Sequence, residues 1–243
     1  MRNRVYRWIV ALGSGYLRLM DVRRTVRGVE NVPSEGGVVL AISHFSYLDF
    51  VLSEWAIWRH RRRYTRFMAT KASFDHRISG PLMRSMRHIP VDRTAGASAY
   101  RFAVDALRRG EIVGVFPETR VSRSFTLLPF KNGAARMAAQ SGCPIVPCVI
   151  WGSHRVMTRT RRTPLLQARH KPVQVVFGDP LPVGPDDDPV VVTEKLHAIM
   201  TSMLEEAMDR DALQAGAWWV PAHRGGSAPS PDEANEMDER TAP

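Results

Sequence analysis

Short apolar runs, most of them rich in Val and Ile, alternate along this chain with longer segments of helical periodicity, and this alternation most constrains its fold. The runs lie near residues 25–29, 38–43, 67–69, 112–116, 145–150 and 173–177. Helical patterns occupy residues 48–60, 96–109, 131–141 and 190–208. Strands that alternate with helices are typical of an α/β domain. We therefore expect an α/β fold with a largely parallel central sheet flanked by helices.

Both ends of the chain differ in composition from the part between them. Apolar residues recur at three- and four-residue steps over 2–20, flanked by arginines, which predicts an amphipathic helix within 1–22. That helix would pack on its own domain or lie in a membrane interface. Gly, Ser, Pro and acidic residues dominate 222–243, which predicts a disordered tail. A single domain is expected over 23–221.

The chain is strongly basic. It has 34 Lys and Arg residues against 24 Asp and Glu, for a net charge of +10 and a pI near 10.4. Such a balance favours anionic partners, namely nucleic acid, lipid headgroups or phosphorylated substrates. Arginine-rich stretches at 59–66 and 155–171 keep a nucleic-acid-binding domain as an alternative. We recognise no helix-turn-helix, zinc-finger or RNA-recognition motif, so no nucleic-acid partner is expected.

The cysteines and the hydropathy of the chain bear on its compartment. Cys143 and Cys148 lie in an apolar segment, where cysteine usually acts as a small hydrophobic residue. We therefore expect neither a disulfide nor a metal site, and residence in the cytosol. No transmembrane helix is expected, because the longest uncharged stretch, 137–154, contains Gly142, Pro144 and Pro147. The N-terminal segment does not resemble a signal peptide.

His44 and Asp49 form a candidate catalytic pair. Side chains five positions apart face away from each other in a regular helix or strand, so these two can meet only if the chain turns between them. The sequence is consistent with a strand that ends at His44, a turn, and a helix whose first turn holds Asp49. The aspartate would then hold Nδ1–H and leave Nε2 as a base. No G-x-S-x-G motif surrounds Ser46, so the base would activate a substrate hydroxyl.

Four further segments follow this pair: MATKASF (68–74), RHIPVDR (87–93), VFPETRVSRSF (115–125) and a segment over 129–150 that contains PFKNGAARMA and CPIVPCVI. Together with SHFSYLDF they resemble the 1-acylglycerol-3-phosphate (lysophosphatidate) acyltransferase family, over about residues 26–177. The resemblance implies that His44 is the catalytic base and that Asp49 orients it. It also implies that Lys71 lies near the phosphate of the acceptor and that Arg93 binds it.

The third segment departs from the family pattern, Phe-Pro-Glu-Gly-Thr-Arg-Ser. Glu118 is followed by Thr119 in place of the glycine. Without a gap, Val121 replaces the family's phosphate-binding arginine and Arg123 keeps register; with a one-residue gap, Arg120 takes its place. Both arginines therefore stay candidates for the phosphate. Glu118 would bind the acceptor or position a loop arginine.

The resemblance implies transfer of a fatty acyl group from acyl-CoA or acyl-carrier protein to a hydroxyl of 1-acylglycerol-3-phosphate, which gives phosphatidic acid. Glycerol-3-phosphate, another lysophospholipid or a glycolipid stays open as acceptor, because the third segment is altered. Neither a metal nor an organic cofactor is expected. Lipid-like substrates, the basic N-terminal segment and RHRRR (59–63) predict a peripheral enzyme on anionic lipid, at the cytoplasmic face of the cell membrane.

Overall fold

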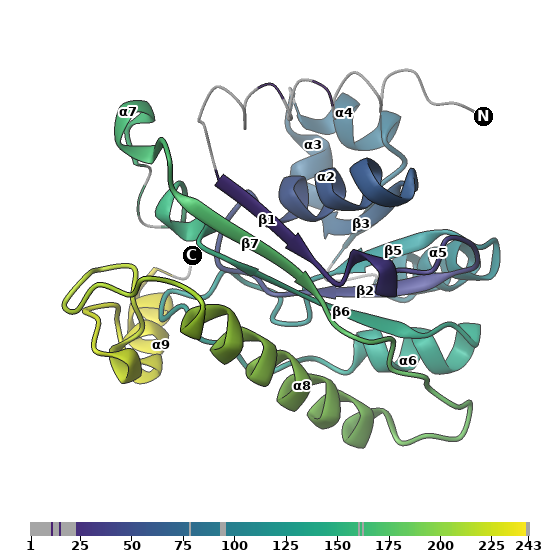
Figure 1. Ribbon diagram of the computed structural model, residues 1–243. Coiled ribbons are helices and arrows are strands. Elements are labelled where there is room, and N and C mark those ends of the chain that lie inside the picture. Colours follow the sequence, from purple (N-terminus) through teal and green to yellow (C-terminus); the bar gives the residue numbers. More distant parts are fainter. Residues whose placement is uncertain are drawn as a thin grey trace.

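The computed structural model describes residues 23–77, 79–92, 96–159, 161 and 163–241, together with residues 11 and 15, and it has an α/β fold (Figure 1). Within this part of the chain, seven strands form one sheet in the order β1-β7-β6-β2-β5-β3-β4. The strands are β1 (Arg23–Arg27), β2 (Val38–Ile42), β3 (Thr65–Thr70), β4 (Ile89–Val91), β5 (Ile112–Val115), β6 (Ile145–Trp151) and β7 (Pro172–Phe177). The predicted strands are confirmed, and β4 is an addition to them.

Most of the sheet is parallel, as the sequence predicts. β6, β2, β5, β3 and β4 all run in the same direction, whereas β7 is antiparallel to β6 and parallel to β1. Ala41 of β2, for example, pairs with Val115 of β5 on one side and with Pro147 of β6 on the other. The carboxyl ends of the five parallel strands therefore lie at one edge of the sheet, which is where α/β sheets bind ligands.

Helices cover both faces of this sheet. α2, α3 and α4 lie on one side of it, and α6 and α8 lie on the other (Figure 1). The α-helices are α2 (Asp49–Arg61), α3 (Lys71–Asp75), α4 (Ser79–Ser85), α5 (Gly96–Arg108), α6 (Gly133–Ser141), α7 (Leu165–Ala168), α8 (Pro189–Asp209) and α9 (Pro231–Arg240). Short 3-10 turns are η1 (Val29–Asn31), η2 (Ser153–Arg155) and η3 (Ala222–Arg224). No helix among the described residues is long and apolar enough to cross a membrane.

The central strands are buried on both faces because both faces carry helices. Val39 and Ala41 of β2 pack in one apolar cluster, while Val38, Leu40 and Ile42 pack in another on the opposite face. All five side chains are buried. A strand buried on both faces reads as a continuous apolar run rather than an alternating one, which explains the VVLAI sequence.

The C-terminal segment differs from the predicted disordered tail over 222–241. Pro231–Arg240 forms α9, and Ser230 caps it by accepting the N–H of Glu233, whose carboxylate accepts the N–H of Ser230 in return. This capping box starts a helix despite the low hydrophobicity of the segment. The prediction of a disordered tail rested on composition, which does not show a capping box. The amphipathic helix predicted within 1–22 lies outside the described residues, apart from positions 11 and 15.

Two arginines of the RHRRR segment at the end of α2 bind backbone carbonyl groups. Arg61 donates through Nε to the carbonyl oxygen of Val29 at 3.0 Å. Arg63 donates to the carbonyl oxygens of Pro33 at 2.6 Å and Gly110 at 2.8 Å. These guanidinium groups tie the loop before β2 to α2 and to the loop before β5. Arg61 and Arg63 thus support the fold in addition to contributing to the positive charge of the chain.

Candidate active site

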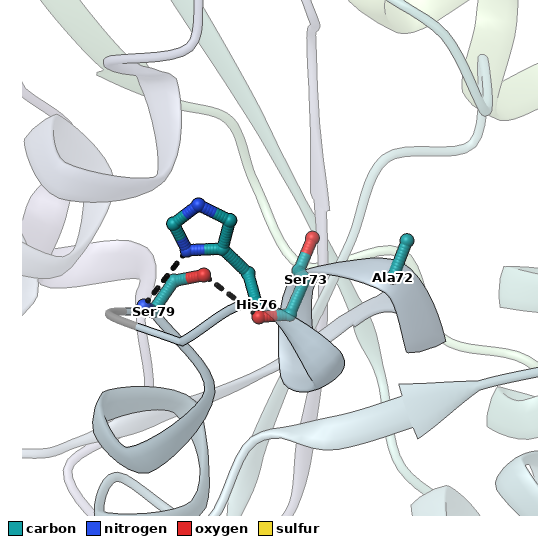
Figure 2. Close-up of a pocket in the computed structure, with 4 residues that line it drawn as sticks. All are labelled: Ala72, Ser73, His76 and Ser79. Carbon is teal, nitrogen blue, oxygen red and sulfur yellow. Dashed lines mark hydrogen bonds between the residues drawn. The ribbon is translucent and has the colours of Figure 1, made fainter.

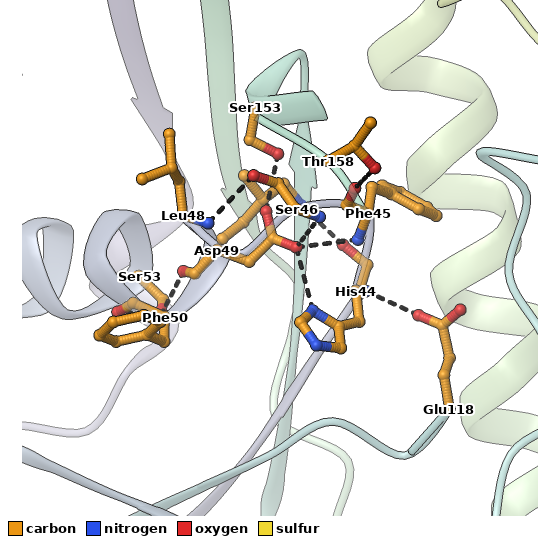
Figure 3. A network of polar contacts seen from close by, with 12 residues as sticks. His44, Phe45, Ser46, Leu48, Asp49, Phe50, Ser53, Glu118, Ser153 and Thr158 are labelled. Atoms are coloured by element: carbon orange, nitrogen blue, oxygen red, sulfur yellow. Dashed lines mark hydrogen bonds and ion pairs between the residues drawn. The ribbon is translucent and has the colours of Figure 1, made fainter. Parts of the chain in front are cut away.

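His44 and Asp49 come together at the carboxyl end of β2, where the chain turns into α2 (Figure 3). Nδ1 of His44 lies 3.3 Å from Oδ2 of Asp49, a long hydrogen bond. The Asp49 side chain is fully buried, whereas that of His44 is 18% exposed. The predicted turn between the two residues, and the place of Asp49 at the start of the helix, are confirmed. The imidazole can thus meet a substrate while its partner is shielded from water.

The Asp49 carboxylate is held on both of its oxygens. Oδ2 accepts the backbone N–H groups of Phe45 at 2.8 Å and Ser46 at 2.7 Å. Oδ1 accepts the hydroxyl of Ser153 at 2.6 Å (Figure 3). These donors, and the N-terminal end of α2, stabilise a negative charge at this buried position. A carboxylate fixed in this way favours the tautomer in which Nδ1–H of His44 donates to it, and in that tautomer Nε2 is free to act as a base.

Aromatic rings fix the other side of the His44 imidazole. Phe116, which follows β5, stacks on it with a centroid separation of 4.1 Å and an interplanar angle of 27°. Phe67 of β3 stacks in turn on Phe116 at 6.3 Å. Three strands that are neighbours in the sheet therefore supply the imidazole and the rings that pack against it. This packing limits the imidazole to one plane, in which Nδ1 faces Asp49.

Glu118 lies beneath the backbone of His44 and is 3% exposed. Its Oε1 accepts the His44 N–H at 2.7 Å, and its Oε2 accepts the Leu128 N–H at 3.0 Å. Burial raises the pKa of Glu118 to about 8, against the opposing effect of these two backbone donors. Its hydrogen bonds therefore join two loops of the site, and no arginine side chain among the described residues hydrogen-bonds to it.

Thr119 stands where the family pattern has glycine, and its backbone conformation is the one that glycine favours. Its φ is 61°, in the left-handed region that residues with a Cβ rarely adopt. The conformation matches the alignment without a gap, in which Val121 takes the place of the family's arginine. Val121 is 5% exposed. On that alignment, an apolar, buried side chain stands where the family pattern has an arginine.

Arg120 and Arg123 lie together with Arg159, and an aspartate of α9 occupies the cluster they form. Oδ1 of Asp238 accepts from Nε of Arg123 at 2.6 Å and from Nη1 of Arg159 at 2.5 Å. Nε of Arg120 lies 3.4 Å from Oδ2 of the same carboxylate. We call Arg120, Arg123 and Arg159 the arginine cluster. The two predicted phosphate-binding arginines are therefore close together, and in this structure they bind an internal carboxylate.

Lys71 is the first residue of α3 and follows β3 at the same edge of the sheet. Its side chain is 61% exposed, and Nζ lies 3.9 Å from Oδ2 of Asp75. Beside it is an open pocket of about 440 Å³, lined by Ala72, Ser73, His76 and Ser79 (Figure 2). Arg93, the other predicted phosphate-binding residue, lies outside the described residues.

Ser153 and Asp238 are absent from the prediction, although both lie close to predicted site residues. Ser153 follows β6, whose carboxyl end lies beside that of β2. The sequence could have indicated Ser153, because it is a polar residue shortly after a predicted strand. Asp238 lies on the unpredicted α9. Among the described residues, no group of three or more His, Cys, Asp or Glu side chains could hold a metal ion. Both cysteines are buried and unbridged.

Comparisons with known proteins place this chain in a family. A family model described as Acyltransferase matches residues 23–151 of the 243-residue chain. A 1-acyl-sn-glycerol-3-phosphate acyltransferase of Bacillus subtilis (strain 168) is 33% identical over 125 residues, 51% of this chain and 60% of the relative. The chloroplastic 1-acyl-sn-glycerol-3-phosphate acyltransferase BAT2 of Brassica napus is 26% identical over 184 residues, 74% of this chain and 51% of the relative. The chain thus spans about half to three fifths of the length of these relatives.

A solved structure shares the fold. It is the crystal structure of the 1-acyl-sn-glycerophosphate (LPA) acyltransferase PlsC from Thermotoga maritima, with a TM-score of 0.70 and 21% identity. The match covers 85% of this chain and 81% of that chain. The family match includes more than half of the chain, with His44, Asp49 and Glu118 inside it and Ser153 two residues beyond its end. The chain belongs to the Acyltransferase family.

Proposed function

We propose that the protein transfers a fatty acyl group from a thioester to the free hydroxyl of 1-acylglycerol-3-phosphate, which gives phosphatidic acid. The observation that carries the proposal is the His44–Asp49 pair, whose imidazole is partly exposed and whose carboxylate is buried. Membership of the Acyltransferase family and the names of the curated relatives support this reaction and this acceptor. Acyl-CoA and acyl-carrier protein are the two donors that fit.

The proposed reaction uses His44 first as a base and then as an acid. Nε2 removes the proton from the acceptor hydroxyl as its oxygen attacks the thioester carbonyl carbon. The tetrahedral intermediate collapses, the carbon–sulfur bond breaks, and the leaving thiolate takes the proton from the imidazolium. Asp49 holds Nδ1–H throughout and stabilises the imidazolium. The steps balance without a metal or an organic cofactor.

Direct attack by the substrate fits the surroundings of the pair better than a serine nucleophile does. The hydroxyl oxygen of Ser46 accepts the N–H of Leu48 at 3.0 Å, and Ser46 is fully buried. The Ser153 hydroxyl is also fully buried and donates to Asp49. Neither serine is placed to receive an acyl group, which favours the acceptor hydroxyl as the attacking group.

A second candidate acceptor lacks the phosphate, and the arginine cluster favours it. Val121 stands in place of the family's arginine, and Asp238 neutralises part of the charge of Arg120, Arg123 and Arg159. A phosphorylated acceptor held at this cluster would have to displace the carboxylate. A phosphate monoester carries nearly two charges and bonds arginine bidentately, so it can compete. A glycolipid or another neutral acceptor would leave Asp238 where it is.

The proposed place of action is an anionic membrane surface, at the cytoplasmic face of the cell membrane. The net charge of +10 and the lipid character of both substrates support peripheral binding there. Each basic residue near an anionic surface contributes about 1 kcal/mol, and screening by salt reduces it. Sedimentation with vesicles that contain anionic lipid, repeated at rising salt, tests this part of the proposal. Binding that is equal on neutral vesicles contradicts it.

The decisive experiment compares acceptors and donors with the same purified protein. Palmitoyl-CoA or palmitoyl acyl-carrier protein is supplied with 1-acylglycerol-3-phosphate, with monoacylglycerol or with a glycolipid, on anionic vesicles. Thiol release and the lipid product are measured for the wild type, for His44→Ala and for a control, His60→Ala, whose residue is exposed on α2.

Phosphatidic acid that forms with the wild type and His60→Ala, but not with His44→Ala, supports the first acceptor. Acylation of the phosphate-free acceptors alone supports the second. Thiol release without an acylated lipid identifies a thioester hydrolase and contradicts both. So does the lack of release with either donor.

A further inference from the structure

We propose that Ser153 is a positioning residue for the His44–Asp49 pair, an inference whose catalytic meaning rests on the proposed acyl transfer. Its hydroxyl donates to Oδ1 of Asp49 at 2.6 Å, between two fully buried side chains (Figure 3). The contact joins residues 104 positions apart, from the turn after β6 to the start of α2. Ser153 acts through Asp49 and touches no reacting atom.

The hydroxyl of Ser153 prevents the carboxylate from turning. Oδ2 of Asp49 already accepts two backbone N–H groups, from Phe45 and Ser46, and faces Nδ1 of His44. Even a partial rotation about the Cβ–Cγ bond would move Oδ2 out of line with these three groups and weaken this arrangement. The hydrogen bond to Oδ1 opposes the rotation, and burial away from water strengthens it. The proton of the imidazole is thereby kept on Nδ1.

The chain reaches Ser153 through a turn that requires glycine. Gly152 has a φ of 92°, and a Cβ at this position would lie 2.2 Å from the carbonyl oxygen of Pro172 in β7. Only a glycine fits between the end of β6 and the neighbouring strand. The close approach lets η2 start at once after the strand and directs the Ser153 hydroxyl to Asp49.

The C-terminal part of the chain anchors this turn. Nε2 of His154 donates to the carbonyl oxygen of Trp219 at 3.0 Å, and its imidazole stacks on Phe125 at 4.3 Å. Arg155 forms an ion pair with Asp211, and its guanidinium carbon lies 3.5 Å from the centroid of Trp219. Residues beyond the family match, which ends at residue 151, therefore hold a group that positions the catalytic pair.

The first test needs no substrate. The ¹⁵N resonances of the His44 imidazole report which nitrogen carries the proton, and they are compared among the wild type, Ser153→Ala, Ser153→Thr and Asp49→Asn. We expect the proton on Nδ1 in the wild type, a mixture of tautomers in Ser153→Ala and Asp49→Asn, and a return to the wild-type state in Ser153→Thr. The control is Ser53→Ala, because Ser53 is equally buried but binds the backbone oxygen of Asp49 at 2.9 Å.

Near-ultraviolet circular dichroism verifies that each variant is folded. If Ser153→Ala is not, Ser153→Cys replaces it, since it keeps the volume and weakens the donor. A tautomer in the folded Ala or Cys variant that matches the wild type overturns the proposal. Because this measurement involves no acyl transfer, its result stands whether or not the proposed function is correct.

The second test uses the acyl-transfer reaction. Ser153→Ala should lower kcat by about 10- to 100-fold, the effect of one hydrogen bond to a charged group, while KM changes less than about two-fold. Ser153→Thr should restore most of kcat. In the Asp49→Asn background, Ser153→Ala should lower kcat by less than about two-fold, because Ser153 then has no carboxylate to position. If Ser153→Ala lowers kcat as much in the Asp49→Asn background as in the wild type, Ser153 acts independently of Asp49 and the proposal is overturned.

Discussion

The buried carboxyl group of Glu118 accepts the backbone N–H of His44 at 2.7 Å. Its second oxygen accepts the N–H of Leu128 at 3.0 Å. Glu118, in the segment after β5, thus binds the main chain of the segment after β2. Phe116, also in the segment after β5, stacks on the His44 imidazole. Two motifs that are 74 positions apart thus form one unit around the His44 imidazole.

Replacing Glu118 by Gln should destabilise the protein and slow the reaction. The amide keeps the volume of the carboxyl group, but its NH₂ would face one of the two backbone N–H donors. One buried donor is then unsatisfied, which costs about 1–3 kcal/mol. Urea unfolding measures the loss, with Glu236→Gln, an exposed position on α9, as the control. Equal stability of the two variants contradicts the role of Glu118.

The stability of the protein should pass through a maximum near pH 6.5. Burial lowers the pKa of His154 to about 3 and that of His88 to about 4, so between about pH 4 and 6.5 these groups bind protons mainly in the unfolded chain. Acid therefore favours unfolding. Burial raises the pKa of Glu118 from 4.5 to about 8, so over that range the folded state alone keeps this proton and rising pH favours unfolding.

Between pH 4.5 and 6.5 the effect of the two histidines on stability exceeds that of Glu118, so stability rises with pH. Between pH 6.5 and 8 only Glu118, of these three groups, changes stability, so stability falls with pH. Thermal unfolding midpoints measured from pH 5 to pH 8 in buffers of equal ionic strength test this balance. A midpoint that rises steadily through pH 8 contradicts it.

Thr119→Gly should stabilise the protein by about 0.5–1 kcal/mol. The left-handed conformation costs a residue with a Cβ about 1–2 kcal/mol, and the greater freedom of glycine in the unfolded chain offsets part of the gain. Thr119→Ala is the matched control, since it removes the same hydroxyl and methyl groups but keeps the Cβ at a φ of 61°. The free energy of unfolding in urea distinguishes the two. A stabilisation by alanine equal to that by glycine refutes the explanation.

Arg63→Ala should cost about 2 kcal/mol of stability, because a charged donor that bonds several carbonyl groups is lost. Arg59→Ala removes an exposed charge from the same segment and should change stability by less than about 0.5 kcal/mol. Both variants lose one positive charge, so vesicle binding serves as a second readout that both should weaken alike. Equal stability of the two variants would show that the contacts of Arg63 do not support the fold.

Asp238→Asn should increase the affinity for a phosphorylated acceptor if the arginine cluster binds it. Removal of the carboxylate leaves Arg120, Arg123 and Arg159 without their shared anion. The KM for 1-acylglycerol-3-phosphate should then fall several-fold, while that for monoacylglycerol stays constant. The control is Asp232→Asn, at an exposed position on the same helix. An increase in KM would show that Asp238 supports the site instead of competing for it.

Local sequence patterns predicted most of the fold and the contact between His44 and Asp49. The main strands and the helices α2, α5, α6 and α8 follow from side-chain periodicity, which a segment carries by itself. The meeting of His44 and Asp49 was predictable because the two are only five positions apart and one turn joins them. Short elements were missed, such as β4 with three residues and α3 with five, because so few positions show no period.

The sequence by itself thus determined the α/β alternation, the family and the His44–Asp49 pair, because each of these depends on residues that are neighbours in the chain. Only the tertiary structure decided that Ser153 holds Asp49 and that Asp238 occupies the arginine cluster. The contacts Ser153–Asp49 and Arg123–Asp238 join positions more than 100 residues apart. They exist because the order of strands in the sheet places β6 beside β2, and because α9 docks against the loop after β5. No local pattern encodes such an order, since it results from burying both faces of the sheet at once.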